Sequence, residues 1–159
     1  MRTFKLCTGA ALAMALVAIG TAHAGIENAG VTAANFLSLG SGARTLSMGG
    51  ATLGLGDDVG GAAWNAAALG WLNGSEAMVS HAGLQNRSLQ EWGAYGGRVR
   101  HTQTRWAVTG LYQGDGSFEG RDASGISTGN FSVSSTALGA TVAQQVGSMV
   151  TLGFGSKYV

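Results

Sequence analysis

The residues best suited to chemistry in this chain are concentrated between Gly42 and Leu69. This stretch combines one basic residue, a Gly-Gly step, two adjacent carboxylates and a Trp-Asn step, namely Arg44, Gly49, Gly50, Asp57, Asp58, Trp64 and Asn65. Paired carboxylates suit general acid-base catalysis, but adjacent side chains point apart, and the surrounding glycines offer no pocket that would desolvate them. We therefore expect Asp57 and Asp58 to cap a helix N-terminus.

Arg44 is the expected ion-pair partner of one of these two carboxylates. A carboxylate in a mostly apolar setting needs a compensating charge, and Arg44 is the basic residue of the same stretch. The glycines nearby do not predict a nucleotide site. Gly54 and Gly56 have the first spacing of a dinucleotide-binding loop, but the third glycine position is occupied by Val59.

The other polar motifs do not predict a metal site. Residues 115–120 resemble the first half of an EF-hand loop, but the twelfth position holds Ile126 where calcium binding needs a bidentate Glu. We expect Asp115, Glu119 and Asp122 to lie in a solvated loop, with weak cation binding as the alternative. His81 and His101 are far apart in the sequence, which favours a strand end or a turn for each. The sequence predicts no cofactor, no metal and no enzymatic activity.

The composition points away from nucleic acid and from an ordinary soluble domain. Of the 159 residues, 11% are charged and 45% hydrophobic, 28 are Gly and none is Pro. Soluble domains average about 25% charged residues. The net charge of +1 provides no basic face for DNA or RNA. This composition indicates many strands with close backbone approaches, or a protein partly surrounded by lipid.

Residues 1–24 have the three parts of a cleaved signal peptide. Arg2 and Lys5 form the positive region, residues 6–20 the apolar stretch, and residues 22–24 an Ala-x-Ala cleavage site. We expect cleavage after Ala24, and the alternative is an uncleaved membrane anchor. Export leaves three destinations, which are the periplasm or medium, the cell surface, and the outer membrane.

The remaining chain predicts a short helix followed by five strands. Helical propensity favours residues 59–69, and residues 25–75 as a whole form a helical or irregular segment. The strands are expected at residues 76–82, 91–99, 105–113, 130–144 and 149–159. In the fourth, the apolar phase switches, which predicts a β-bulge near Ser134 to Thr136.

The last strand has the alternation of a transmembrane barrel strand. Val150, Leu152, Phe154 and Tyr158 share one face, while small or polar residues occupy the other. The links at residues 100–104 and 145–148 are short, whereas those at residues 83–90 and 114–129 are long. Short turns and long loops alternate in the same way in outer-membrane barrels. Five strands are too few to close such a barrel, so we expect either an N-terminal fragment of a longer protein or an assembly of several chains.

Residues 35–69 also resemble a known family. The resemblance is carried by four groups of residues, which are Phe36-Leu37-x-Leu39-Gly40-x-Gly42-Ala43-Arg44, Met48-Gly49-Gly50-Ala51, Asp57-Asp58 and Trp64-Asn65-x-Ala67-x-Leu69. Together they are similar to the N-terminal signature of the PorV/PorQ family, relatives of FadL-type outer-membrane channels. The run from Gly153 to Tyr158 resembles an early barrel strand of the same family.

The resemblance implies an antiparallel, FadL-like outer-membrane β-barrel with an N-terminal hatch. Residues 25–75 would form the hatch and residues 76–159 the first barrel strands. Seven hatch residues would have a structural or gating role, namely Arg44, Gly49, Gly50, Asp57, Asp58, Trp64 and Asn65. The family has Asn-Pro-Ala where this chain has Asn65-Ala66-Ala67. Without that Pro, we expect the backbone to continue a helix through Ala66.

The implied function is non-enzymatic, in transport or protein secretion across the outer membrane. Two readings are open within the family: an accessory of type IX secretion, and a FadL-like channel for hydrophobic small molecules. The expected partners are outer-membrane lipid, with secretion-system components or a hydrophobic ligand, and not nucleic acid. The alternative outside the family is a soluble secreted β-protein.

Overall fold

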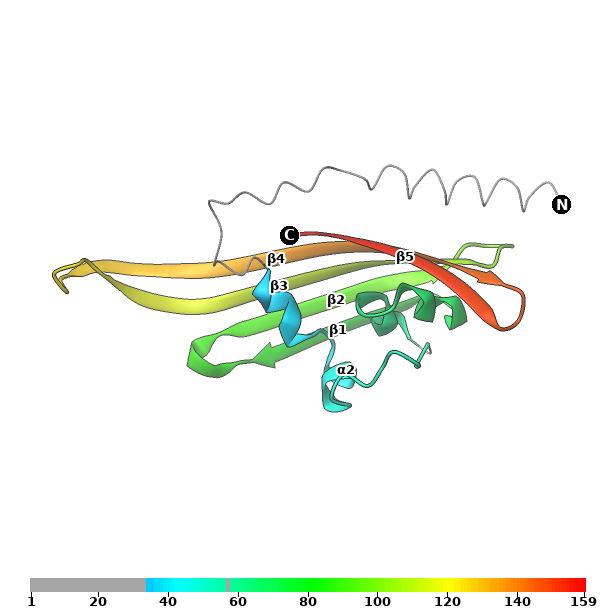
Figure 1. The fold of residues 1–159 in the computed structure, drawn as a ribbon, viewed down its shortest axis with the longest axis horizontal. Coiled ribbons are helices and arrows are strands. Elements are labelled where there is room, and N and C mark those ends of the chain that lie inside the picture. Colours follow the sequence, from blue (N-terminus) through cyan, green and yellow to red (C-terminus); the bar gives the residue numbers. More distant parts are fainter. Residues whose placement is uncertain (1–33, 57) are drawn as a thin grey trace. The chain divides into compact units, whose positions relative to one another are not determined.

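A single five-stranded antiparallel sheet makes up most of the protein (Figure 1). The computed structural model describes residues 34–56 and 58–159. The strands are β1 (Glu76–Gly83), β2 (Leu89–Arg98), β3 (Thr104–Arg121), β4 (Ser127–Val146) and β5 (Val150–Tyr158). Each strand pairs with the next in sequence order. The predicted signal peptide, residues 25–33 of the predicted hatch, and Asp57 lie outside the described residues.

The sheet confirms the mainly β prediction and the positions of the five strands, but it corrects the predicted loops. Most of residues 114–129, expected as a long loop, belongs to β3 and β4, which extend as a hairpin to a turn at residues 122–126. The other links are residues 84–88, 99–103 and 147–149. The expected alternation of short and long connections is therefore wrong, because backbone pairing between the two segments turns their polar residues into strand.

The predicted β-bulge occurs in the partner strand. Gly114 pairs with Ser134 and Ser117 pairs with Ser132, so β3 carries one more residue than β4 in this interval. Gly116, within it, has a φ of 77°. The prediction of a bulge within β4 is therefore wrong. The extra residue in β3 brings Phe118 onto the same face as Phe131, and the two rings lie 5.6 Å apart.

Short helices cover one face of the sheet, and we call residues 34–56 and 58–75 the covering segment (Figure 1). Its elements are η2 (Asn35–Leu39), α2 (Ala43–Ser47), η3 (Val59–Ala63) and η4 (Ala66–Trp71). The predicted single helix over residues 59–69 is wrong, because two 3-10 helices are separated at Trp64 and Asn65. Asn65 has an extended backbone, with φ −141° and ψ 103°.

The hydrophobic core lies between the covering segment and the sheet. Val59 and Leu69 of the covering segment are fully buried, and they pack with residues from β2, β3 and β4. Many of these sheet residues are small, such as Ala94, Ala107 and Ala143. Small side chains let the helices approach the sheet closely. A further short helix, η5 (Gln85–Arg87), lies in the β1–β2 link.

Candidate functional site

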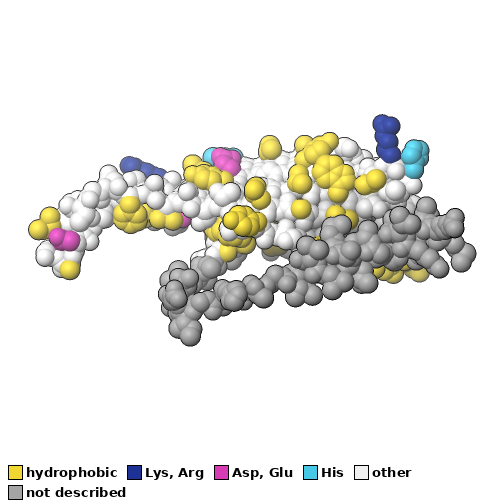
Figure 2. Space-filling model, turned by 90° about the horizontal axis from the view of Figure 1, so that it is seen from above, with side chains coloured by type: hydrophobic (Ala, Val, Ile, Leu, Met, Phe, Trp, Pro, Cys, Tyr) yellow, Lys and Arg dark blue, Asp and Glu magenta, His cyan; other side chains and the backbone are white. Residues whose placement is uncertain are grey.

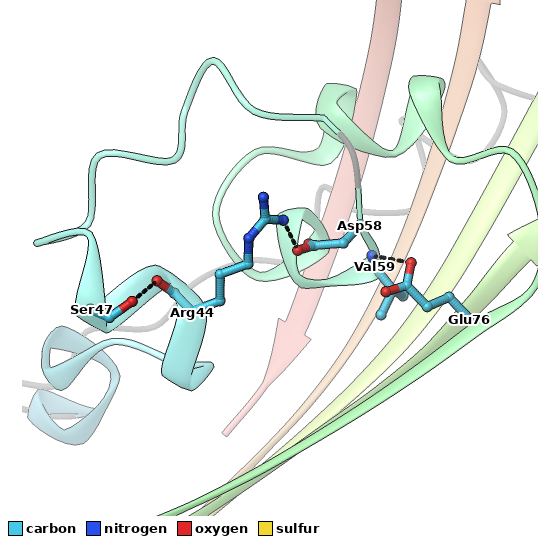
Figure 3. A network of polar contacts seen from close by, with 5 residues as sticks. All are labelled: Arg44, Ser47, Asp58, Val59 and Glu76. Atoms are coloured by element: carbon cyan, nitrogen blue, oxygen red, sulfur yellow. Dashed lines mark hydrogen bonds and ion pairs between the residues drawn. The ribbon is translucent and has the colours of Figure 1, made fainter.

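The charged residues of the covering segment meet in one polar network (Figure 3). A guanidinium nitrogen of Arg44, from α2, forms an ion pair with Oδ2 of Asp58, which precedes η3. The Asp58 side chain is 18% exposed and that of Arg44 43% exposed. This pair confirms the predicted partnership between Arg44 and a carboxylate of the acidic pair. It joins two elements that are separated by a long loop.

The predicted capping role of Asp58 is wrong. Asp58 occupies the N-cap position of η3, but its side chain makes no capping hydrogen bond there. The N–H of Val59 instead donates to Oε2 of Glu76 at 3.1 Å (Figure 3). Glu76 is the first residue of β1, so the carboxylate that satisfies the helix start comes from the sheet. Engagement with Arg44 orients the Asp58 carboxylate toward α2.

Asn65 and Trp64 fix the break between η3 and η4. The Asn65 Oδ1 accepts a hydrogen bond from the Ala67 N–H at 3.1 Å, and its Nδ2 donates to the Leu53 carbonyl at 3.0 Å. Asn65 is therefore the N-cap of η4, and Ala66 is the first residue of that helix. The expected continuation of one helix through Ala66 is wrong because the Asn65 cap ends it. Trp64 Nε1 donates to the Ser41 carbonyl at 3.3 Å.

Gly49 and Gly50 form the turn after α2. Their φ angles are 64° and 80°, in the left-handed region that favours glycine. The Gly50 N–H donates to the Thr45 carbonyl and the Gly49 N–H to the Leu46 carbonyl, each at 3.0 Å. These bonds satisfy the last carbonyls of the short helix. The two glycines are thus required by the turn that positions α2 and Arg44.

Side chains of the sheet hold the covering segment by hydrogen bonds to its backbone carbonyls. Thr141 of β4 donates to the Ala62 carbonyl at 3.4 Å, and Lys157 Nζ of β5 donates to the Ala63 carbonyl at 3.0 Å. Both acceptors lie at the C-terminal end of η3, where carbonyls lack helical partners and a cation is favourable. Arg105 of β3 donates from Nε to the Leu72 carbonyl at 3.3 Å. Three strands therefore contribute to the docking of one segment.

Glycine in β5 allows η4 to sit directly on the strand. A Cβ added to Gly153 would lie 2.3 Å from the carbonyl carbon of Ala66 and from the amide nitrogen of Ala67. Backbone atoms cannot retreat as a flexible side chain can. On the other side of the contact, a Cβ on Gly70 would lie 2.3 Å from the Thr151 side chain. The small residues of the covered face are therefore a steric requirement of this docking.

The opposite face of the sheet, which we call the open face, carries exposed hydrophobic side chains. Cross-strand pairing and the alternation of burial place on it Val79, Tyr95, Val108, Tyr112, Leu138, Val150, Leu152, Phe154 and Tyr158. The predicted alternation of β5 is confirmed, with Thr151, Gly153 and Lys157 on the covered side. Figure 2 shows hydrophobic side chains gathered over the middle of the described part, with the visible Lys and Arg side chains toward its two ends.

The polarity of the faces reverses in the β3–β4 hairpin. Beyond Tyr112, the open face continues with Ser134, Ser132 and Ser117. The covered-side face of the hairpin instead carries the exposed rings of Phe118 and Phe131. The apolar area of the open face therefore ends where the hairpin begins.

The acidic residues of the other polar motif form hydrogen bonds and an ion pair with residues close to them in sequence. Asp115 accepts a hydrogen bond from Gln113 at 2.6 Å, Glu119 pairs with Arg121 at 2.7 Å, and Asp122 accepts from two turn N–H groups. Asp115 and Glu119 lie in β3, so the expected solvated loop is wrong for both. The described residues contain no group of three or more His, Cys, Asp or Glu that could hold a metal ion.

The two histidines have different settings. His81 lies within β1, and its Nδ1 is 2.6 Å from Oε1 of Glu91, its exposed cross-strand partner. His101 lies in the β2–β3 turn with a φ of 60°, as expected for a turn residue. Among the residues that the structure describes, neither histidine has the second hydrogen-bond partner that would orient a catalytic base.

A Gly-x-Ser-x-Gly pattern at residues 125–129 does not form a nucleophile elbow. Such an elbow places its Ser between a strand and a helix. Ser127 instead begins β4 after a hairpin turn, and it is exposed.

Arg105 is the residue that the sequence analysis missed. It was expected only as the start of a strand, yet it is 4% exposed and lines a cavity of about 460 Å³ with Gly56, Gly70, Trp71, Asn73 and Gln145. Burial, and secondarily the nearby charge of Arg98, lowers the pKa of Arg105 from its usual value. The available signal was its inward phase in β3, which it shares with Ala107 and Leu111.

Searches against protein-family models, curated proteins and solved structures each find no match for this chain. In the part of the chain that the structure describes, no helix is long and apolar enough to cross a membrane.

Proposed function

We propose that this sheet is part of the wall of an outer-membrane β-barrel of the PorV/PorQ type, which acts in transport or protein secretion. In this arrangement the open face contacts lipid and the covering segment lies on the lumen side as a hatch. The observation that carries the proposal is the apolar surface of the open face. Exposed apolar side chains cover it, although the sheet already buries an apolar core on its covered face, together with Gln90, Arg105, Gln113 and Thr141. A water-soluble antiparallel sheet that packs one face on a core commonly turns a polar face to the solvent.

The end of the apolar area supports the same proposal. On β3 the apolar phase runs from Trp106 to Tyr112, with an aromatic residue at each end, and polar residues follow. Aromatic residues are enriched at the membrane interfaces. The hairpin beyond Tyr112 would then project from the bilayer into water.

Fractionation of the cell tests this proposal. The full-length protein should sediment with outer membranes and should migrate differently on gels before and after heating, because barrels resist unfolding by detergent when unheated. Recovery in the periplasmic wash, without heat-modifiable migration, would instead support a soluble secreted β-protein and overturn the proposal.

One observation favours transport of a hydrophobic small molecule as the second candidate. Gln90 and Gln113 are cross-strand partners on the covered face. Nε2 of the first and Oε1 of the second are buried and have no hydrogen-bond partner among the described residues. Phe118 and Phe131 lie farther along the same face, in the hairpin. An apolar molecule with one hydroxyl or amide group would pack against the two rings and form hydrogen bonds with the two amide atoms. Mass spectrometry of extracts from the purified protein tests this, and their lack of such a molecule would favour secretion.

A further inference from the structure

Two arginines face each other at the start of the β2–β3 pairing. Arg98 and Arg105 are direct cross-strand partners. Like charges in such positions destabilise a sheet. Arg98 is exposed, whereas Arg105 is 4% exposed, so water screens only one of the two charges. Burial first, and repulsion by Arg98 second, lower the pKa of Arg105.

The described residues supply Arg105 with neutral acceptors only. Its Nε donates to the Leu72 carbonyl at 3.3 Å, and its Nη1 donates to the Gln103 carbonyl at 2.9 Å and to Oε1 of Gln145 at 3.3 Å. Among the described residues, no hydrogen bond uses Nη2 and no carboxylate contacts the guanidinium. A buried charge that lacks an ionic partner is costly. Within the described residues, the Arg105 charge therefore has no anionic partner.

Two neighbouring cavities bring further basic groups to the same place. The first, of about 460 Å³, contains Arg105, and the second, of about 420 Å³, is lined by Arg98, Arg100 and His101. Asn73 lines both cavities. The described residues that line them include no Asp or Glu. Asn73 is thus shared by one cavity that contains Arg105 and another that contains Arg98, Arg100 and His101.

We propose that this basic cluster binds a phosphate group. Nη2 of Arg105 would approach it from within the sheet, Arg98 and Arg100 would approach from the surface, and the Asn73 amide would donate between them. Phosphate fits better than a carboxylate because it offers more acceptor oxygens and carries up to two negative charges, which matches several cationic donors. The site does not depend on the proposed barrel, since its residues come from the β2–β3 pair, the turn between these strands and the covering segment. The phosphate source is either free inorganic phosphate or the headgroup of an anionic lipid.

Titration of the purified full chain with inorganic phosphate tests the site. At constant ionic strength, we expect phosphate to bind and to raise the unfolding temperature, while chloride does neither. The double variant Arg98→Gln/Arg100→Gln should weaken phosphate binding at least tenfold. Arg121→Gln, at the far end of β3, removes one positive charge elsewhere and should leave the affinity unchanged. Equal responses to phosphate and chloride, or unchanged binding in the double variant, would overturn the proposal.

A second comparison, made first with the unchanged protein, separates the two phosphate sources. Vesicles of phosphatidylglycerol and of phosphatidylcholine are compared, and the bound protein is then challenged with inorganic phosphate. Release from phosphatidylglycerol by phosphate identifies a lipid headgroup, whereas phosphate binding without a preference for phosphatidylglycerol identifies the free anion. Arg105→Gln should abolish binding in either case. If Arg105→Gln does not fold, the double variant of the two exposed arginines still decides the outcome.

Discussion

The N–H of Val59 donates a hydrogen bond to Oε2 of Glu76, which joins the start of η3 to the first residue of β1. Val59 is fully buried, so its N–H has no access to water in place of this acceptor. The covering segment is therefore connected to the sheet near Glu76 as well as through the side chains of β3, β4 and β5.

Replacement of Glu76 should loosen this end of the covering segment. Glu76→Ala leaves the buried Val59 N–H without an acceptor, which costs about 1–3 kcal/mol. Glu76→Gln keeps an oxygen acceptor and should lose less of the free energy of unfolding. Chemical denaturation of the two variants measures the difference. Equal losses would contradict the assignment of the Glu76 oxygen as the helix cap.

The Arg44–Asp58 ion pair should contribute modestly. Because the Arg44 side chain is 43% exposed, a double-mutant cycle with Arg44→Ala and Asp58→Ala should give a coupling of about 0.5–1 kcal/mol, reduced by high salt. The Glu119–Arg121 pair, with side chains 48% and 59% exposed, is the control and should couple less strongly. Additive effects of the Arg44 and Asp58 substitutions would show that the pair contributes nothing to stability.

Proline should be accepted at position 66 and rejected at position 67. Ala66 is the first residue of η4 and follows the extended Asn65, which is the setting that proline prefers. Ala66→Pro should be neutral or stabilise the fold by up to about 1 kcal/mol. Ala67→Pro removes the N–H that donates to Asn65 and should destabilise the fold clearly. The unfolding temperatures of the two variants provide the measurement, and the reverse order would refute the assigned helix start.

A methyl group at Gly153 should displace η4. Its Cβ would lie 2.3 Å from two backbone atoms of the covering segment, so Gly153→Ala should cost about 1–3 kcal/mol or more. The matched control is Gly110→Ala in β3, whose Cβ would meet its nearest neighbour at an ordinary 3.8 Å. Limited proteolysis should cut the covering segment faster in the first variant only. Similar protection in both would mean that η4 does not rest on Gly153.

A charge on the open face should distinguish lipid from water. Leu138 is 60% exposed, so Leu138→Arg in water should change stability by no more than about 0.5 kcal/mol. Facing the centre of a bilayer, the same charge costs about 2–4 kcal/mol and should reduce outer-membrane insertion. Ser132→Arg lies on the same face of β4 but in the polar hairpin, and it should insert normally. Normal insertion of both variants would argue against a lipid-facing sheet.

The strands could be predicted where alternation reflects burial. In β5 the sequence separates Val150, Leu152 and Phe154 from small residues, and the structure places the two sets on opposite faces. The hairpin could not be predicted this way, because residues 114–129 are rich in Ser and Gly and present no apolar period. Their strand structure comes from backbone pairing between two segments, which local pattern does not reveal.

The site was predictable only in part for a similar reason. Arg44 and Asp58 have complementary charges in one short stretch, so their pairing could be expected. Glu76 belongs to a strand, and its role as a cap depends on how the chain folds back. The burial of Arg105 likewise depends on Leu72 and Gln145, which are distant in sequence.

The contacts between the covering segment and the sheet also impose an order of assembly. Lys157 donates to the Ala63 carbonyl, and Gly153 contacts Ala66. The covering segment leaves the ribosome first, so these contacts cannot form until β5 has been synthesised. Contacts of such long sequence separation form slowly, since the intervening chain must be ordered first. Until β5 pairs with β4, the apolar side chains of η3 and η4 have no complete surface to bury them. The covering segment is therefore synthesised before the sheet but completes its docking only after the sheet has formed. During this interval the chain is most prone to aggregation and most in need of a chaperone.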